Sequence, residues 1–423
     1  MRSGPEPASV AVRQTAVAPD RARSLANFLG IGQICSWGSI YYCFPLIALA
    51  METELGWTKS ELYGALTFGL LFASLFTYPV GIAIDRGHGR HVMAWSSVAA
   101  AAVMIWWSMV HSLVAFYLLS AALGAIQAAI LYEPAFAVLA RRVGPGRARA
   151  GITTITLWGG FASTVFIPLE QLLLDQWGWR DSLWVLAAVN LVCALGYLYW
   201  VRPELDVMQP SHAKAKAENI ARDKAVVRQA LRGPVFWLLL LALSIYAGTF
   251  SAFTFHMYPI LQELNISTID IVQALAVIGP AQVAGRILIT LFAARTSMRL
   301  LGSIVISVFP LVFALLAQPS PSFWMVATIF TVYGLCNGIF TIVRSLVAPE
   351  MLSQHAYGAL NGLLVIPMTI ARAVAPLAAA WLWATDRSYH LVLVALIWSS
   401  VLLLATFWTA GWVSWSRQRR AST

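Results

Sequence analysis

The sequence contains few charged residues. Only 11% of its 423 residues are Asp, Glu, Lys or Arg, whereas 59% are hydrophobic. An ordinary soluble domain carries about 25% charged residues on a solvated surface. The composition therefore excludes a soluble protein and places the chain in a membrane, where its apolar runs of about 18 to 25 residues match helices that cross the bilayer.

Several chemical motifs are also missing. The four cysteines have no paired spacing and lie in apolar runs, which excludes a disulfide framework and a metal site. The sequence has no glycine-rich phosphate loop, no zinc-type histidine spacing, and no serine or cysteine with a convincing buried base. We therefore expect no enzymatic activity, no cofactor and no metal. The polar first residues lack the features of a signal peptide, so we predict a disordered cytoplasmic tail over 1–24.

The net charge of +10 does not indicate a nucleic-acid partner. The basic residues do not form one face but lie between the apolar runs, which is a signal of membrane topology. With both termini in the cytoplasm, most Lys and Arg residues lie on the cytoplasmic side. We therefore predict a multi-pass protein of a bacterial cytoplasmic (inner) membrane, with the N- and C-termini inside.

The apolar runs predict an all-α protein with twelve transmembrane helices in two bundles of six. The N-terminal bundle covers 25–201 and the C-terminal bundle covers 234–414. A basic cytoplasmic linker over 202–233 separates them, and a cytoplasmic tail covers 415–423. The predicted spans are 25–50, 61–84, 92–110, 113–140, 151–174, 182–200, 235–258, 270–293, 300–317, 323–346, 359–383 and 390–413.

The loop after the second predicted span reads GIAIDRGHGRHVM. It resembles the signature loop of the major facilitator superfamily, a family of transporters with this twelve-helix organisation. The resemblance implies a conformational latch between the two bundles, because ion pairs and helix-end contacts there stabilise one facing state. The alternative is a solvated loop. The matching residues are Gly81, Asp85, Arg86, Gly89 and Arg90.

Other stretches resemble the branch of this superfamily that carries monocarboxylates and oxalate or formate. They include GWRDSLWVL from Gly178, GPAQVAGR from Gly279 and NGIFTIVRSLVAPEM from Asn337. The acidic, tryptophan-bearing stretch of eukaryotic monocarboxylate carriers is replaced by SWGSIYY from Ser36. The likeness therefore indicates a branch and not a substrate.

Two arginines interrupt apolar spans at positions that the inverted repeats of this fold make equivalent. Arg286 lies in the eighth span and Arg372 in the eleventh, each roughly 15 Å along the helix axis from water. Burying a guanidinium costs several kcal/mol or more, so a compensating partner is needed. Each arginine could form a structural ion pair or cap backbone carbonyls. The spans of the second bundle contain no deep acid, and we therefore expect a transported anion to be the partner.

Other polar residues in the spans line up with these arginines or suit the gate helices. Gln282 precedes Arg286 by one turn, and Thr369 precedes Arg372 by three residues. Polar or aromatic side chains on the first and tenth spans are further candidates for the substrate cavity, although such residues also serve as contacts between packed helices. These candidates are Trp37, Tyr41 and Asn337.

Two titratable residues are candidates for proton coupling or gating. Glu133 lies in the fourth span, where its carboxylate could carry a proton or pair with a nearby basic residue. His256 lies near the outer end of the seventh span and could titrate near neutral pH, gate, or be a satisfied core histidine. The sequence assigns no role to Glu170.

The sequence therefore predicts a secondary active transporter for a small organic anion, a mono- or dicarboxylate, working by alternating access with proton coupling or exchange. An exporter of a larger amphipathic or aromatic compound is the alternative within transporters. A membrane sensor with a carrier fold is the alternative of another class. The expected partners are the anionic substrate, the lipid bilayer and protons, and we expect a monomer.

Overall fold

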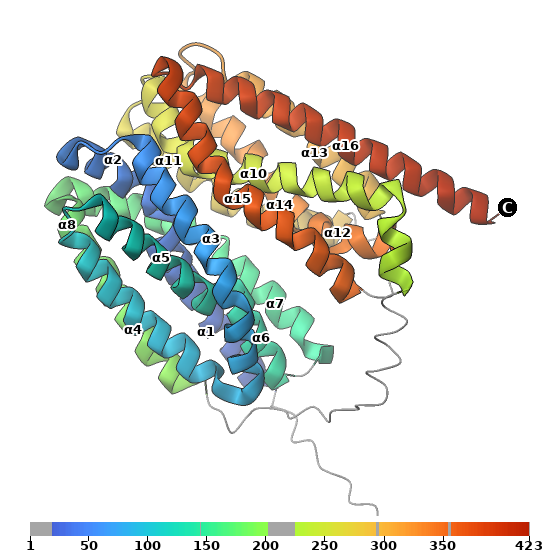
Figure 1. Cartoon of the computed structure of the whole chain (residues 1–423), viewed down its shortest axis with the longest axis horizontal. Helices are drawn as coiled ribbons and strands as arrows, with labels where there is room; N and C mark the ends of the chain where they lie inside the picture. Colours follow the sequence, from blue (N-terminus) through green and yellow to red (C-terminus); the bar gives the residue numbers. More distant parts are fainter. Residues whose placement is uncertain (1–18, 144, 202–224, 293–295, 354–356, 423) are drawn as a thin grey trace, which may run out of the picture.

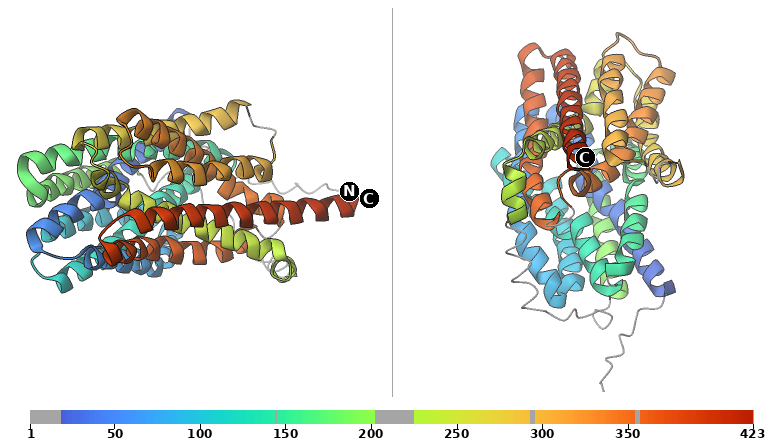
Figure 2. Two further views of the ribbon diagram at one scale, coloured as in Figure 1. Left: turned by 90° about the horizontal axis from the view of Figure 1, so that it is seen from above. Right: turned by 90° about the vertical axis from the view of Figure 1, so that its right-hand side faces the viewer.

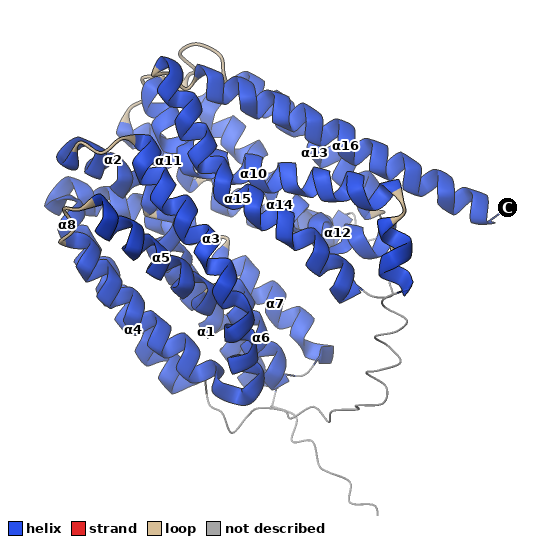
Figure 3. Cartoon of the chain, viewed as in Figure 1, coloured by secondary structure: helices blue, strands red, loops and turns tan. Residues whose placement is uncertain are grey.

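The computed structural model describes the chain apart from residues 1–18, 144, 202–224, 293–295, 354–356 and 423. Every element in this part of the chain is a helix (Figure 3). The helices form two bundles that lie side by side (Figure 1). We call them the N-half and the C-half.

The N-half starts at Pro19, six residues before the predicted first span. A five-residue π-helix interrupts its first span, and Leu131 breaks its fourth, just before Pro134. Its helices are α1 (Pro19–Trp37), η1 (Gly38–Tyr42), α2 (Phe44–Leu55), α3 (Lys59–Ala83), η2 (Ile84–His88), α4 (Gly89–Ser108), α5 (Leu113–Ile130), α6 (Tyr132–Val143), α7 (Pro145–Gly159) and α8 (Ala162–Trp200).

The first long helix of the C-half starts at Pro234. Its last helix continues to Ser422, so most of the predicted tail 415–423 is helical. Most of the predicted linker lies outside the described residues, as do the first eighteen residues of the predicted N-terminal tail. The helices are α10 (Pro234–Glu263), α11 (Thr268–Ala276), α12 (Ile278–Phe292), α13 (Met298–Leu316), α14 (Phe323–Met351), α15 (Tyr357–Asp386) and α16 (His390–Ser422).

Ten helical stretches in the described chain are long and apolar enough to cross a membrane. Two of them, Lys59–Ser108 and Ala150–Trp200, have 50 and 51 residues. Each contains a glycine with positive φ, Gly87 at 89° and Gly178 at 74°. A residue with a side chain rarely adopts this conformation, so glycine allows the chain to change direction there.

Local sequence signals set several helix starts. Thr58 and Glu61 form a capping box, in which the Thr58 amide donates to the Glu61 carboxylate at 2.8 Å. Serine hydroxyls accept from backbone amides at the starts of α11, α13 and α14. These bonds satisfy amides that have no partner inside the helix.

Helix α1 begins and helix α16 ends at the same end of the molecule (Figure 2). We call this the terminal end and the opposite end the distal end. The connections α2–α3, α4–α5, α10–α11, α13–α14 and α15–α16 lie at the distal end.

Each half has its own hydrophobic core, and the two cores meet towards the distal end. Leu46 and Ile167 of the N-half join the core of the C-half, while Phe255 and Ala380 of the C-half join that of the N-half. Helix α3 packs against α15, and α8 against α11 and α12. Nearer the terminal end, α3 is not covered, since Leu75 is 65% and Tyr78 77% exposed.

Candidate functional site

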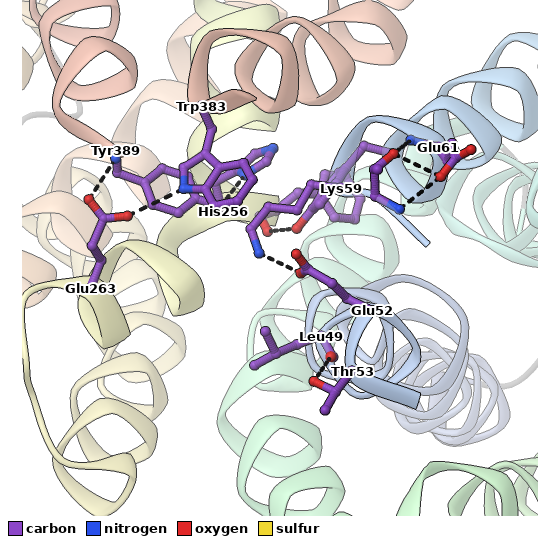
Figure 4. A network of polar contacts seen from close by, with 12 residues as sticks. Leu49, Glu52, Thr53, Lys59, Glu61, His256, Glu263, Trp383 and Tyr389 are labelled. Carbon is purple, nitrogen blue, oxygen red and sulfur yellow. Dashed lines mark hydrogen bonds and ion pairs between the residues drawn. The ribbon is translucent and has the colours of Figure 1, made fainter. Parts of the chain in front are cut away.

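A polar network closes the distal end between the halves (Figure 4). The Lys59 ammonium forms an ion pair with Glu52 at 2.5 Å within the N-half. The same ammonium lies 4.5 Å from the ring centroid of Trp383 in the C-half. The Trp383 indole donates to Glu263 at 3.3 Å, and the Tyr389 amide donates to the other oxygen of Glu263 at 2.7 Å. A charged pair of one half is thus joined to an acidic network of the other.

His256 of α10 is part of this closure. Its side chain is fully buried, with Nδ1 3.0 Å from the Tyr389 hydroxyl and Nε2 2.9 Å from the Pro376 carbonyl. Its ring stacks on Tyr63 of the N-half, with centroids 4.2 Å apart. Both ring nitrogens have protein partners, which favours the alternative of a satisfied core histidine. A proton-coupling role for His256 stays a prediction.

Helix α3 also binds the backbone of the C-half directly. The Tyr63 hydroxyl donates to the Phe255 carbonyl at 2.8 Å, and the Thr67 hydroxyl donates to the Ala373 carbonyl at 2.7 Å. Both carbonyls belong to helices, and Ala373 precedes Pro376 by three residues. Because these bonds are made by side chains, they can break without unfolding either helix.

Arg286 of α12 lies against the N-half. Its guanidinium donates to the Thr156 carbonyl of α7 at 2.6 Å, and the side chain is half-buried. The expectation that Arg286 lacks a protein partner is therefore wrong. Backbone carbonyls were one alternative from the sequence, but the partner lies in the other half, 130 positions away, where no sequence pattern indicates it.

Arg372 of α15 has different surroundings. Its side chain is half-buried, and its guanidinium makes no hydrogen bond or ion pair with another residue of the described chain. Its charge acts on the hydroxyls of Tyr41 in the N-half and Tyr246 in the C-half. Arg372 therefore lies between the two halves.

Three arginines converge on the same region. The charges of Arg286, Arg344 and Arg372 all act on the hydroxyl of Tyr246. Arg344 and Tyr246 were not among the residues predicted from the sequence. The available signal for Arg344 was an arginine inside the apolar run GIFTIVRSLV on the predicted tenth span, the same kind of signal that identified the other two.

Aromatic side chains of the N-half face this region. Trp37 packs against Tyr41 and Tyr132, with centroids 5.0 and 5.1 Å away. Tyr41 in turn contacts Phe255 of the C-half at 4.6 Å. The charge of Arg286 acts on Tyr42 and Tyr132. The predicted cavity residues Trp37 and Tyr41 are thus brought together with both predicted arginines.

The remaining predicted substrate residues lie on helices of the C-half. Asn337 is 2% exposed and its side-chain oxygen accepts from the Tyr246 hydroxyl, which links it to the three arginines. Gln282 is half-buried on α12, one turn before Arg286. The Thr369 hydroxyl donates to the carbonyl of Val365 at 2.9 Å, within its own helix. Their binding roles stay predictions.

Glu133 lies in the first turn of α6 and is exposed. Burial therefore does not favour a proton on this carboxylate in this conformation. Leu131 breaks the predicted fourth span, so that Glu133 starts a new helix instead of lying inside a continuous one. The structure leaves its proton-coupling role as a prediction.

The predicted latch residues surround η2. An Arg141 side chain of α6 donates to the Asp85 carbonyl, while Asp85 and Arg86 are exposed and Arg90 is half-buried. A side chain at Gly89 would lie 2.5 Å from Val138 of α6, whereas Gly81 has open space around it. The contacts of these residues described here lie within the N-half, and a latch between the halves stays a prediction.

No group of three or more His, Cys, Asp or Glu residues in the described chain could hold a metal ion. A small cavity lies at the junction of the halves, lined among others by Tyr41, Ile167, Phe255 and Tyr258. Its volume of about 10 Å³ is at the lower limit for a single water molecule. This part of the junction is closed in the structure.

Comparisons with solved structures show the same fold. The nucleoside transporter NupG superposes with a TM-score of 0.69 at 15% identity, covering 92% of this chain and 98% of that one. A bacterial homologue of the human lysosomal transporter Spinster gives 0.71 at 13% identity, covering 93% and 98%. A D-xylose-proton symporter gives 0.66 at 12% identity, covering 94% and 97%.

No curated protein matches the sequence. The family model described as Major Facilitator Superfamily matches residues 29–376, which is most of the chain. The two helical halves, the signature-like loop at η2 and this match all indicate the same family. The protein is an integral membrane protein with many membrane-crossing helices, and it belongs to the Major Facilitator Superfamily of transporters.

Proposed function

We propose that the protein is a secondary active transporter for a small organic anion, a mono- or dicarboxylate. The observation that carries this proposal is Arg372, which is half-buried, acts electrostatically on Tyr41 and Tyr246, and has no ion-pair partner in the described chain. A guanidinium at this depth is costly unless an anion accompanies it. Its planar fork donates two parallel hydrogen bonds to a carboxylate and stays charged at any working pH.

In this proposal Arg286 both binds the anion and contacts the other half. In the distal-closed state it donates to the Thr156 carbonyl across the junction of the halves. A carboxylate that reaches Arg286 competes with this carbonyl for the same donor. Binding of the anion therefore changes a contact between the halves, which is what couples a substrate to alternating access.

We propose twelve crossings with both termini in the cytoplasm. The two longest helical stretches would extend about 75 Å if straight, more than twice the hydrocarbon thickness, so each is assigned two crossings that reverse at Gly87 and Gly178. Basic residues near the terminal end support this orientation. They include Arg86, Arg90, Arg141, Arg142, Arg299, Arg417 and Arg419.

With this orientation the structure is closed to the outside. The contacts of Tyr63, Thr67, His256 and Trp383 join the halves at the distal end. The uncovered stretch of α3 around Tyr78 lies towards the cytoplasm. Rocking of the halves about the substrate site would break the distal contacts and form others at the terminal end.

One observation favours a second candidate, an exporter of a larger aromatic or amphipathic compound. Trp37, Tyr41, Tyr42 and Tyr132 form a continuous aromatic group beside the arginines. Such a surface can stack on an aromatic cargo while an arginine holds its acidic group. The small-anion proposal and this alternative share Arg372 and differ in the size of the cargo.

A ligand panel tests the proposed function. Purified protein is heated in the presence of formate, lactate, oxalate, succinate and benzoate, because a ligand that binds the native state raises its apparent stability. We expect at least one small carboxylate to raise Tm in the wild type but not in Arg372→Ala. Stabilisation by none of the small acids contradicts the proposal, and stabilisation by benzoate alone favours the aromatic alternative.

Counterflow separates a transporter from a sensor. Proteoliposomes loaded with the stabilising acid are diluted into a trace of its radiolabelled form. A transporter accumulates label by exchange, whereas a sensor binds the acid without exchange. If the acid binds but no counterflow occurs, the protein is a sensor and not a transporter.

A further inference from the structure

Glu170 of α8 is a buried carboxylic acid with no partner. The residue is 1% exposed, and neither of its carboxyl oxygens has a hydrogen-bond donor within the described chain. The binding region around Arg372 does not use it. An acid in such a position needs a separate explanation, because buried polar groups are normally hydrogen-bonded.

Its environment favours the neutral form. An ionised carboxylate without a counter-charge or donors is very costly in an apolar medium, whereas a protonated carboxyl costs only as much as another neutral polar group. The residues before and after it on the same face, Phe166, Ile167 and Leu173, are buried and apolar. The side chain is therefore suited to holding a proton in this conformation.

The charged groups on neighbouring elements do not compensate Glu170. The titratable group that interacts with it electrostatically is the Cys43 thiol, whose own sulfur donates to the Ser39 carbonyl. The Tyr41 hydroxyl of η1 interacts electrostatically with Arg372, and the Tyr42 hydroxyl interacts with Arg286. Other charged groups on these elements have other contacts: Glu52 with Lys59, Glu54 with Arg180, Asp270 with Ser267, and Arg286 with Thr156. The rest lie in the first two turns of α1 and the first turn of α4, at the terminal end: Arg21, Arg23, Arg90 and His91.

Glu170 lies between two contacts that join the halves. Six residues before it, the Thr164 hydroxyl donates to the Ala276 carbonyl of the C-half at 2.8 Å. One residue after it, the Gln171 side chain accepts from the Tyr258 hydroxyl of the C-half at 2.7 Å. Opening of the distal end must separate these pairs. The same movement frees this segment of α8 from the C-half.

The neighbouring part of the first span is a π-helix, a feature often found at functional sites. Helix η1 approaches α8 so closely that a side chain at Gly38 would lie 2.1 Å from the ring of Phe166, one turn before Glu170. Ile167, three residues before Glu170, lines the small cavity at the junction of the halves. The cavity therefore lies within one turn of Glu170 along α8.

We propose that Glu170 is a proton-binding site whose occupancy favours the distal-closed state. The inference builds on the proposed transport function and makes its conformational equilibrium depend on pH. When the distal end opens, the carboxylate takes a proton from a hydronium ion, so that one O–H bond of hydronium breaks to leave water and the O–H bond of the carboxyl group forms. Closure then buries the neutral acid. Loss of the proton to water requires the distal end to open again, so proton occupancy and conformation are linked.

Infrared difference spectroscopy tests the protonation directly, with no transported anion present. At neutral pH the wild-type protein in liposomes should show the C=O band of a protonated carboxyl, and Glu170→Gln should lose it. The matched control is Asp181→Asn, an exposed acid in the same helical stretch, which should keep the band. A wild type without this band, or a band that survives in Glu170→Gln, overturns the proposal.

A distance measurement tests the conformational link. Spin labels are placed at the exposed residues Ser112 of the N-half and Ser320 of the C-half, both at the distal end. The native cysteines are buried or half-buried, so labels attach preferentially to introduced exposed cysteines. Raising the pH should increase the longer distance population in the wild type. Glu170→Gln should keep the short distance at every pH, and Asp181→Asn should behave as the wild type.

Glu170→Leu serves as a second variant, because it removes no described hydrogen bond and should also keep the short distance. Persistence of the wild-type pH response in both variants overturns the proposal and points to another titratable group at the junction, such as His256. Neither experiment uses an anion. Failure of the carboxylate panel therefore rejects the proposed cargo, whereas failure here rejects the proton site.

Discussion

The ring of His256 stacks on the ring of Tyr63, with centroids 4.2 Å apart and planes inclined by 20°. The two residues belong to α10 and α3, in opposite halves of the molecule. His256 is also held from its own half by Tyr389 and the Pro376 carbonyl. A side chain fixed by one half and stacked on the other can serve as a gate contact, because its two sides belong to bodies that separate.

Replacement of Tyr63 by Leu should weaken distal closure. The variant loses the stacking contact, worth about 0.5–1.5 kcal/mol, and the hydrogen bond to Phe255, worth about 1 kcal/mol. A total near 2 kcal/mol changes the ratio of closed to open molecules by roughly 30-fold. Distances between spin labels at Ser112 and Ser320 should show a larger open population.

Tyr63→Phe is the matched control, since it keeps the stacking and removes only the hydroxyl. Its shift should be smaller than that of Tyr63→Leu. Equal closed populations in the wild type and both variants would show that the stacked pair does not hold the distal end.

Arg372 should be required for anion binding. A charge-assisted hydrogen bond contributes about 1.5–3 kcal/mol, so Arg372→Ala should weaken binding of the stabilising acid by about 10- to 150-fold. Arg372→Lys keeps the charge and loses the planar fork, and should recover only part of this affinity. Calorimetric titration with the acid measures both. Wild-type affinity of Arg372→Ala would remove the residue from the site.

Arg286 should affect both binding and conformation. Arg286→Ala should lose uptake while the protein still inserts, because it removes a donor to the anion and the contact with the Thr156 carbonyl. Unlike Arg372→Ala, it should also increase opening between α7 and α12, which cross-linking of cysteines introduced at Thr156 and Val283 measures. Normal transport by Arg286→Ala would exclude both roles.

The sequence predicts most of the architecture because helices in a bilayer must satisfy their own backbone and present apolar side chains to lipid. Long apolar runs therefore indicated an all-helical membrane protein, and Arg286 and Arg372 stood out as charges within them. Breaks within spans were harder to predict. The π-helix at Gly38 depends on close packing with Phe166, a residue more than a hundred positions away.

The site was predicted less completely because its partners come from different helices. The bond from Arg286 to Thr156 joins the two halves, and the partners of His256 come from α15 and the α15–α16 connection. Periodicity along one helix identifies a face but not what that face meets. Glu170 illustrates this limit, because its significance lies in the absence of nearby donors and charges among the described residues.

The Lys59–Glu52 pair should stabilise the distal gate. The side chains of Lys59 and Glu52 are 11% and 26% exposed, so removal of either leaves the other only partly solvated. Lys59→Met should lower the free energy of unfolding by roughly 1–3 kcal/mol, the cost of an unsatisfied charged partner. The double variant Lys59→Met with Glu52→Gln should recover part of this loss, since no charge remains unpaired. Thermal unfolding of the three proteins measures the effect, and a double variant less stable than Lys59→Met would contradict it.

Close helix packing in the C-half depends on Gly338 of α14. A β-carbon there would lie 2.1 Å from the backbone oxygen of Gln282 on α12, so Gly338→Ala must separate the two helices. We expect a loss of about 1–3 kcal/mol in the free energy of unfolding, as for other overpacked positions. At Gly362 of α15 a β-carbon meets nothing within 4 Å, and Gly362→Ala should stabilise its helix by about 0.5–1 kcal/mol. Chemical denaturation in detergent compares the two variants.

Because α12 also carries Gln282 and Arg286, Gly338→Ala should in addition weaken anion binding, whereas Gly362→Ala should not. Equal stability and affinity in both variants would show that α12 can shift without cost to the site.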